Sequence, residues 1–194
     1  MRIHYGGKYN GDPASLPTPE HREGAVKFRE PGSIKTLSLV ANGIALAMYF
    51  VTMSILFYRG GADAFRPGAF ILTLVCMIPH EFLHAICFKE DAYIYHKLSH
   101  GMLFVVGPET MSRARFIFMS MLPNLVFGFI PFALFLINPS LTFLGTLGAM
   151  SIPCGAGDYM NVFNALTQMP KGARTYLYQM NSYWYLPKEE EQYA

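Results

Sequence analysis

The sequence predicts an all-α membrane protein with four transmembrane helices and a small β-hairpin at the membrane surface, between the second and third helices. Three observations lead to this fold class. Of the 194 residues, 52% are hydrophobic and 14% are charged, whereas soluble proteins carry about 25% charged residues. Four apolar stretches are long enough to cross a bilayer, which takes about 20 residues. Aromatic and β-branched residues around a turn, within residues 92–106, predict the hairpin.

The elements divide the chain into a polar tail, a membrane core and a second tail. Residues 1–33 are rich in glycine, proline and charge, and we expect a flexible cytoplasmic tail or a loosely packed collar. The core is residues 34–164, and its four predicted transmembrane helices cover residues 34–58, 68–88, 116–137 and 141–164. Residues 165–194 are predicted to form a cytoplasmic tail, aromatic with some strand character and then acidic at Glu189, Glu190 and Glu191.

The positive charges predict the orientation of the helices. With the N-terminus in the cytoplasm, every one of the 15 Lys and Arg residues except Arg59 and Arg66 lies on the cytoplasmic side. Because Lys and Arg are enriched in cytoplasmic loops, we expect a multi-pass protein of the cell membrane with both termini in the cytoplasm. The net charge of +2 gives no indication of nucleic-acid binding.

The second apolar stretch contains the motif H-E-x-x-H at residues 80–84. Residues four apart share one face of a helix, so His80 and His84 can bind one Zn²⁺ while Glu81 flanks the metal-bound water as the catalytic base. Ionisable groups at membrane depth cost several kcal/mol and persist mainly where they pair, bind a metal or react. The alternative is a helix whose two histidines bond to neighbouring helices.

A catalytic zinc site has three protein ligands and an open position for water. Among the other predicted spans, Asp158 is the one further charged residue within a span core. With a rise of 1.5 Å per residue, His84 and Asp158 lie about 6 Å and 9 Å from the same cytoplasmic boundary. This similar depth favours His80, His84 and Asp158 as the metal ligands. Three residues that follow the motif remain weaker alternatives: Cys87, Glu90 and Asp91.

Two further polar residues have predicted roles. Asn124, beside Pro123 in the third span, is a candidate donor to substrate or to an oxyanion, and a helix-packing hydrogen bond is the alternative that we favour. Glu109 precedes the third helix, and we expect its carboxylate at the N-terminus of that helix, where the helix dipole favours a negative charge.

The segment H-E-F-L-H-A, the proline-interrupted third span and Gly155-Ala156-Gly157-Asp158 resemble the small bacterial integral-membrane zincin peptidases. That family is in turn similar to the core of the site-2 intramembrane metalloproteases. The resemblance covers about residues 68–164 and implies zinc as the cofactor, with the three ligands and the catalytic glutamate named above. One feature differs from many site-2 proteases, because Asp158 is followed by Tyr159 and not by glycine.

Together these features predict a zinc-dependent intramembrane or membrane-surface endopeptidase, in which Glu81 assists a zinc-bound water in hydrolysing a peptide bond. The expected partners are the lipid bilayer and a membrane-protein or peptide substrate, which the predicted hairpin can bind as an added strand. A non-proteolytic metal-binding membrane scaffold or sensor is the alternative function. A helix-packing protein without a metal is a third.

Overall fold

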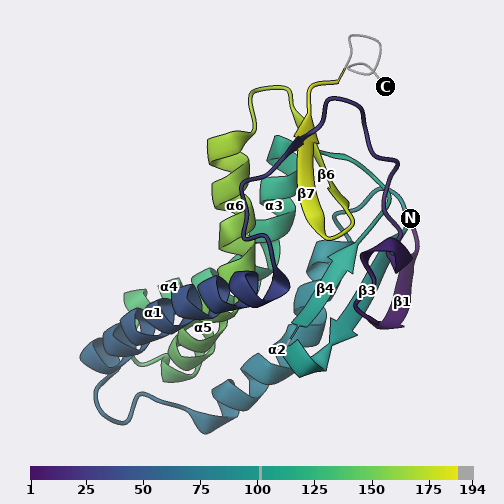
Figure 1. The fold of residues 1–194 in the computed structure, drawn as a ribbon. Coiled ribbons are helices and arrows are strands. Elements are labelled where there is room, and N and C mark those ends of the chain that lie inside the picture. The colour runs from purple at the N-terminus through teal and green to yellow at the C-terminus, as the bar shows by residue number, and fades with distance from the viewer. Residues whose placement is uncertain (101, 188–194) are drawn as a thin grey trace. The chain divides into compact units, whose positions relative to one another are not determined.

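The structure, a computed structural model, describes residues 1–100 and 102–187. The chain forms two compact units, each assembled from segments that are distant in the sequence (Figure 1). The helical unit comprises Pro31–His80 and Ser120–Met160. The sheet unit comprises Met1–Glu30, Glu81–Met119 and the described residues from Asn161 onward.

Local signals in the sequence set the ends of the helices. Ser33 caps the first helix because its hydroxyl accepts the N–H of Thr36 at 3.2 Å. Pro67 begins the second helix, where its missing N–H breaks no helical hydrogen bond. The helices are α1 (Ile34–Gly60), α2 (Pro67–Ala85), α3 (Arg113–Asn124), α4 (Ile130–Ile137), α5 (Thr142–Cys154) and α6 (Ala156–Gln168). A π-helical segment, Leu125–Phe129, joins α3 to α4.

Three helical stretches are long and apolar enough to cross a membrane, namely Lys35–Gly60, Pro67–Ala85 and Arg113–Ile137. They correspond to the first three predicted spans. The fourth predicted span is divided at Gly155 into α5 and α6, and α5 has only 13 residues, whereas a spanning helix needs about 20. Pro153, in the last turn of α5, and Gly155, at its end, explain this break. A fourth crossing of the membrane stays a prediction.

The helical unit has an apolar core in which α5 packs against both α1 and α4. The rings of Phe132 and Phe135 lie 6.0 Å apart and pack against Leu56 of α1 and Ile152 of α5. A close approach of α5 depends on Gly148, because a Cβ at this position would lie 2.6 Å from the Cβ of Phe132. Small residues at helix contacts are typical of membrane helices, since they let the backbones approach.

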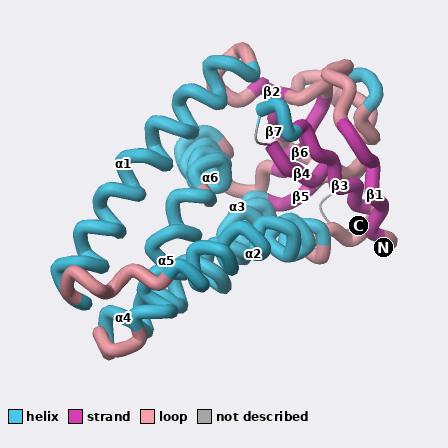
Figure 2. Tube along the Cα trace, turned by 90° about the horizontal axis from the view of Figure 1, so that it is seen from below, coloured by secondary structure: helices cyan, strands magenta, loops and turns pink. Residues whose placement is uncertain are grey.

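The described strands form two sheets in the sheet unit, drawn in magenta in Figure 2. The first sheet contains β1 (Ile3–Lys8), β3 (Ala92–Lys97) and β4 (Met102–Val106), in the order β1-β3-β4. Strand β1 is parallel to β3, and β4 is antiparallel to it, so the predicted hairpin is present as β3 and β4. The second sheet has the order β2-β7-β6-β5 and consists of β2 (Val26–Lys27), β5 (Met111–Ser112), β6 (Arg174–Tyr178) and β7 (Asn181–Tyr185).

The structure contains more strand than the all-α fold class with one hairpin predicts. The N-terminal segment, expected as a flexible tail or loose collar, supplies β1 to the first sheet and β2 to the second. Short edge strands of this kind depend on their partners, which lie far away in the sequence, more than on their own pattern. The predicted acidic end, Glu189, Glu190 and Glu191, lies outside the described residues.

Candidate metal centre

The motif H-E-x-x-H lies near the end of α2, which continues through Pro79 to Ala85. Ligand atoms of His80, Glu81 and His84 lie within 4.8 Å of one another. All three residues are buried, with exposed fractions of 9%, 6% and 7%. The helix therefore presents the two imidazoles on one face, as the spacing in the sequence predicts, with the carboxylate of Glu81 close beside them.

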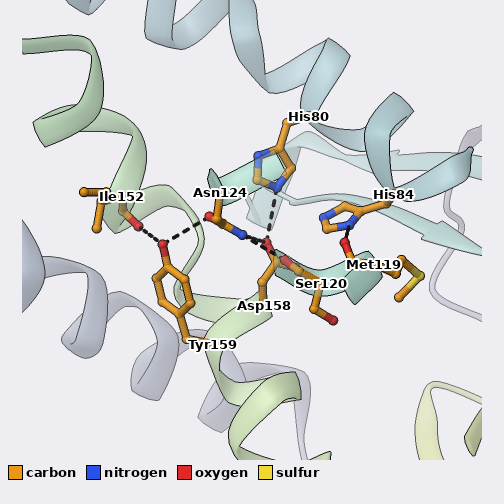
Figure 3. A network of polar contacts seen from close by, with 8 residues as sticks. All are labelled: His80, His84, Met119, Ser120, Asn124, Ile152, Asp158 and Tyr159. Carbon is orange, nitrogen blue, oxygen red and sulfur yellow. Dashed lines mark hydrogen bonds and ion pairs between the residues drawn. The ribbon is translucent and has the colours of Figure 1, made fainter. Parts of the chain in front are cut away.

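A backbone carbonyl orients the ring of His84. The Nδ1 of His84 lies 2.9 Å from the carbonyl oxygen of Met119 in α3 (Figure 3). Because a carbonyl oxygen can only accept, Nδ1 carries the proton and donates it, and Nε2 is the nitrogen that can bind a metal. Metal-binding histidines commonly donate their other ring N–H in this way, which fixes the ring and raises the basicity of the ligating nitrogen.

In the helical unit, Asp158 contacts the other histidine of the motif. The Nε2 of His80 lies 3.2 Å from Oδ2 of Asp158 (Figure 3). Asp158 lies in the first turn of α6, where the helix dipole favours a carboxylate. The two side chains are 11% and 14% exposed, so the contact is largely shielded from solvent. The sequence-predicted third ligand is therefore in direct contact with the first.

Asn124 holds the carboxylate of Asp158 from the other side. Its Nδ2 donates to Oδ2 of Asp158 at 2.7 Å and to the carbonyl oxygen of Ser120 at 3.0 Å. Its Oδ1 accepts from the hydroxyl of Tyr159 at 3.2 Å. Asn124 is 2% exposed, and both donor contacts of its amide are made inside the protein. This geometry agrees with a helix-packing hydrogen bond, the alternative favoured from the sequence.

Gly155 provides the space for this amide. A Cβ at Gly155 would overlap the side chain of Asn124, with the Nδ2 atom only 2.9 Å away. The residue that separates α5 from α6 therefore also allows close packing against Asn124. A short stretch of sequence, from Gly155 to Asp158, combines the helix break, the packing space and the carboxylate.

Two of the weaker ligand candidates have other partners. The carboxylate of Asp91 accepts the N–H of Arg2 at 2.9 Å, and its second oxygen lies 3.0 Å from Nε2 of His4. The thiol of Cys87 donates to the carbonyl oxygen of Leu83 at 3.3 Å. Neither belongs to the metal-ligand group found among the described residues.

Glu109, expected at the N-terminus of α3, reaches the first turn of that helix through an ion pair with the side chain of Arg115, while the hydroxyl of Ser112 accepts the backbone N–H of Arg115 at 3.3 Å. Glu109 also has partners outside the helix. Its carboxylate accepts the backbone N–H groups of Lys89 and Glu90, at 2.9 Å and 2.8 Å. The carboxylate thus binds the chain that follows α2, and no local sequence pattern indicates these partners, because they lie about 20 residues earlier.

Fold and site together define the class of the protein: a helical protein with membrane-length apolar helices and a buried H-E-x-x-H group suited to a metal. The model of the family described as "Putative zincin peptidase" matches residues 73–174, more than half of the chain. The chain belongs to this family, and zinc is the metal that the family implies. No curated protein and no solved structure matches the chain.

Proposed function

We propose that the protein is a zinc-dependent endopeptidase, similar to site-2 proteases, that cleaves peptide bonds within a membrane or at its surface. The observation that carries this proposal is the buried group of His80, Glu81 and His84, in which the ring of His84 is oriented by a backbone carbonyl. Membership of the zincin peptidase family and the three membrane-length helices support it.

The side chains fit a catalytic zinc ion, and we propose His80, His84 and Asp158 as its ligands. Two imidazoles and one carboxylate are a common ligand set for catalytic zinc, and they leave one position open. Two of the ligands already have the outer partners that such sites need, since Met119 binds His84 and Asn124 binds Asp158. A zinc ion held there supplies a Lewis acid that activates water and polarises a peptide carbonyl.

Glu81 is the proposed general base. Its carboxylate would take the proton of the attacking water and return it to the leaving amine. Its 6% exposure supports this role, because bulk water then competes little for the carboxylate. Asn124 is proposed to position Asp158, while its predicted role as an oxyanion donor is the competing proposal for the same residue.

The proposed substrate is a membrane protein or peptide in an extended conformation. Strand β4 is the last strand of its sheet and pairs with β3 on one side. An extended peptide can pair with the opposite edge of such a strand through backbone hydrogen bonds. The proposal includes four membrane crossings with both termini in the cytoplasm, which the positive charges of the loops support.

The substitution Glu81→Gln tests the function, because it removes the base and keeps the shape of the side chain. The full-length protein, purified in detergent, is expected to contain stoichiometric zinc and to cut peptides from a mixture of transmembrane segments. Glu81→Gln should retain the zinc and lose roughly 100-fold or more of the cleavage rate. The exposed Glu20→Gln serves as the matched control. Wild-type protein without zinc, or undiminished cleavage by Glu81→Gln, would contradict the proposal.

One observation favours the metal-binding scaffold as a second candidate. Asp158 of α6 contacts both His80 of α2 and Asn124 of α3, so a metal at this carboxylate would strengthen a link between three helices. A scaffold predicts stoichiometric zinc, a lower unfolding temperature in His84→Ala and Asp158→Ala, and no cleavage of any peptide in the mixture.

A further inference from the structure

Besides an apolar cluster that includes Ala85, Phe88, Phe116 and Met119, two polar contacts of the described sheet unit link the end of α2 and the chain after it to the first turns of α3. One is the hydrogen bond from Nδ1 of His84 to the carbonyl oxygen of Met119. The other is the carboxylate of Glu109, which lies in the connection between β4 and β5. The second contact has no part in the zinc chemistry proposed above.

The carboxylate of Glu109 binds two segments of the chain at once, and we call this arrangement the Glu109 clamp. One carboxylate oxygen accepts the N–H groups of two successive residues, Lys89 and Glu90. The other oxygen pairs with the guanidinium of Arg115. Glu109 is 7% exposed, and hydrogen bonds to a buried charge are stronger than those between neutral groups. The clamp thus connects the chain after α2 to α3.

The two segments that Glu109 connects are the same two that the hydrogen bond between His84 and Met119 connects, and only a few residues separate the two contacts on each segment. On α3, Arg115 and Met119 are four residues apart and therefore lie on one face of the helix. On the other side, the N–H of Cys87 donates to the carbonyl oxygen of His84 at 3.1 Å, which continues the helix in a tight turn towards Lys89. A shift at the clamp would therefore move the ring of His84 relative to its acceptor.

The loop that carries Glu109 is itself fixed. Gly107 packs so closely that a Cβ there would lie 2.6 Å from the ring of Phe88 and 2.9 Å from the carbonyl oxygen of Asp91. On the other side of Glu109, the guanidinium of Arg174 donates to the hydroxyl of Thr110 at 2.8 Å and to its carbonyl oxygen at 2.9 Å. Glu109 is therefore held by neighbours on both sides, as a positioning residue must be.

We propose that Glu109 and Arg115 are positioning residues for His84. They fix the end of α2 against α3, so that Nδ1 of His84 stays on the carbonyl of Met119 and Nε2 stays directed to the metal. The consequence for metal binding rests on the proposed function, whereas the consequence for the protonated ring nitrogen concerns the metal-free protein.

The test measures which ring nitrogen of His84 carries the proton, by NMR of ¹⁵N-histidine-labelled full-length protein in detergent, without metal and at a pH where the imidazoles are neutral. His84→Gln identifies the signal. Wild type is expected to show the form protonated on Nδ1. In Glu109→Gln and Arg115→Gln, His84 should show a mixture of both forms, and Arg115→Lys, which keeps the charge, should restore the wild-type signal.

Zinc affinity, measured by competition with a chelator, gives the second readout. Glu109→Gln should weaken zinc binding about tenfold, the lower range for residues that hold a ligand in place. Asp91→Asn is the matched control, because it removes a neighbouring carboxylate that binds Arg2 and His4, and it should change the zinc affinity less than about twofold.

The two experiments separate the two proposals. Wild-type protein that binds no zinc would refute the proposed function, while the NMR signal would still decide the positioning role. Unchanged NMR signals in both Glu109→Gln and Arg115→Gln would overturn that role, and Arg115→Gln decides it if Glu109→Gln does not fold.

Discussion

The Nδ2 of Asn124 lies 2.7 Å from Oδ2 of Asp158, the same oxygen that lies 3.2 Å from Nε2 of His80. A single carboxylate oxygen therefore has an amide donor on one side and an imidazole on the other. The amide comes from α3, so the orientation of the carboxylate is set by a helix other than its own. Outer contacts of this kind hold ligands in place in metal sites.

Replacing Asn124 by alanine should weaken zinc binding by about 10- to 100-fold, because Asp158 loses the donor that orients it. Zinc competition with a chelator measures the change. Asn138→Ala is a suitable control, since the side chain of Asn138 binds Ser140 in a turn outside this network. If Asn124 instead served as an oxyanion donor, its substitution would lower the cleavage rate at saturating zinc and leave the zinc affinity unchanged.

The sequence predicted the parts of the site that depend on one helix. His80, Glu81 and His84 follow from a fixed spacing, and the structure confirms that they form one group. Asp158 became a candidate only through the predicted topology, from the similar depth of His84 and Asp158 in separate spans, and the structure places its carboxylate beside His80. The part of Tyr159 was missed because the residue has no spacing signal: its hydroxyl lies 3.2 Å from Oδ1 of Asn124 and 2.9 Å from the carbonyl oxygen of Ile152, which are distant in the sequence or carry no side-chain signal.

In the fold, too, the elements defined by local sequence were predicted and those defined by distant partners were not. Apolar length was sufficient to find α1, α2 and the stretch from α3 to α4, because a membrane-spanning helix makes its backbone hydrogen bonds within itself. Strands β1 and β2 were not predicted, because each is defined by pairing with a strand that lies far away in the chain. Sequence patterns report local periodicity and do not report such long-range pairs.

Gly155→Ala should destabilise the protein by about 1–3 kcal/mol, the usual cost of forcing a group into a packed interior. The new methyl group would overlap the amide of Asn124. Gly157→Ala is the matched control two residues later, because its Cβ would meet no atom within 4 Å. That variant should be neutral or more stable by up to about 1 kcal/mol, since alanine favours helix over glycine. Thermal unfolding in detergent measures both, and equal unfolding temperatures would show that the space at Gly155 is not needed.

The carboxyl of Glu30, which lies outside the three membrane-length helices, should make the stability of the protein depend on pH. Burial raises the pKa of its carboxyl above the ordinary value of 4.5, although the N–H of Ser182 donates to it at 2.7 Å and opposes the shift. A raised pKa means that the folded state binds the proton more tightly than the unfolded state. The stabilisation is therefore complete below about pH 4.5 and is lost as the pH rises through the folded-state pKa.

Glu30→Gln should accordingly raise the unfolding temperature at neutral pH, because glutamine keeps an oxygen for Ser182 and carries no buried charge. The difference from wild type should shrink as the pH falls towards the ordinary pKa of the carboxyl. Unfolding temperatures across a pH series measure this, with the exposed Glu23→Gln as control. A Glu30→Gln variant that is less stable than wild type at neutral pH would show that the charged hydrogen bond outweighs the cost of burial.

The turn between β6 and β7 has backbone strain that a single substitution can relieve. Gln179 and Met180 both have positive φ, 48° and 63°, a conformation that costs a side-chain-bearing residue about 1–2 kcal/mol. Gln179 is exposed, whereas Met180 packs against the apolar cluster around Tyr9 and Leu16, so Gln179 is the position to change. Glycine at this position relieves the strain but loses about 0.5–1 kcal/mol more conformational entropy on folding than glutamine does. Gln179→Gly should therefore stabilise the protein by a net value of about 0.5–1 kcal/mol.

Gly172→Ala is the opposite case. The φ of Gly172 is 84° and a Cβ there would meet nothing within 4 Å, so backbone strain alone should destabilise the variant by about 1 kcal/mol. Unfolding temperatures that move in the same direction for both variants would contradict the argument from backbone strain.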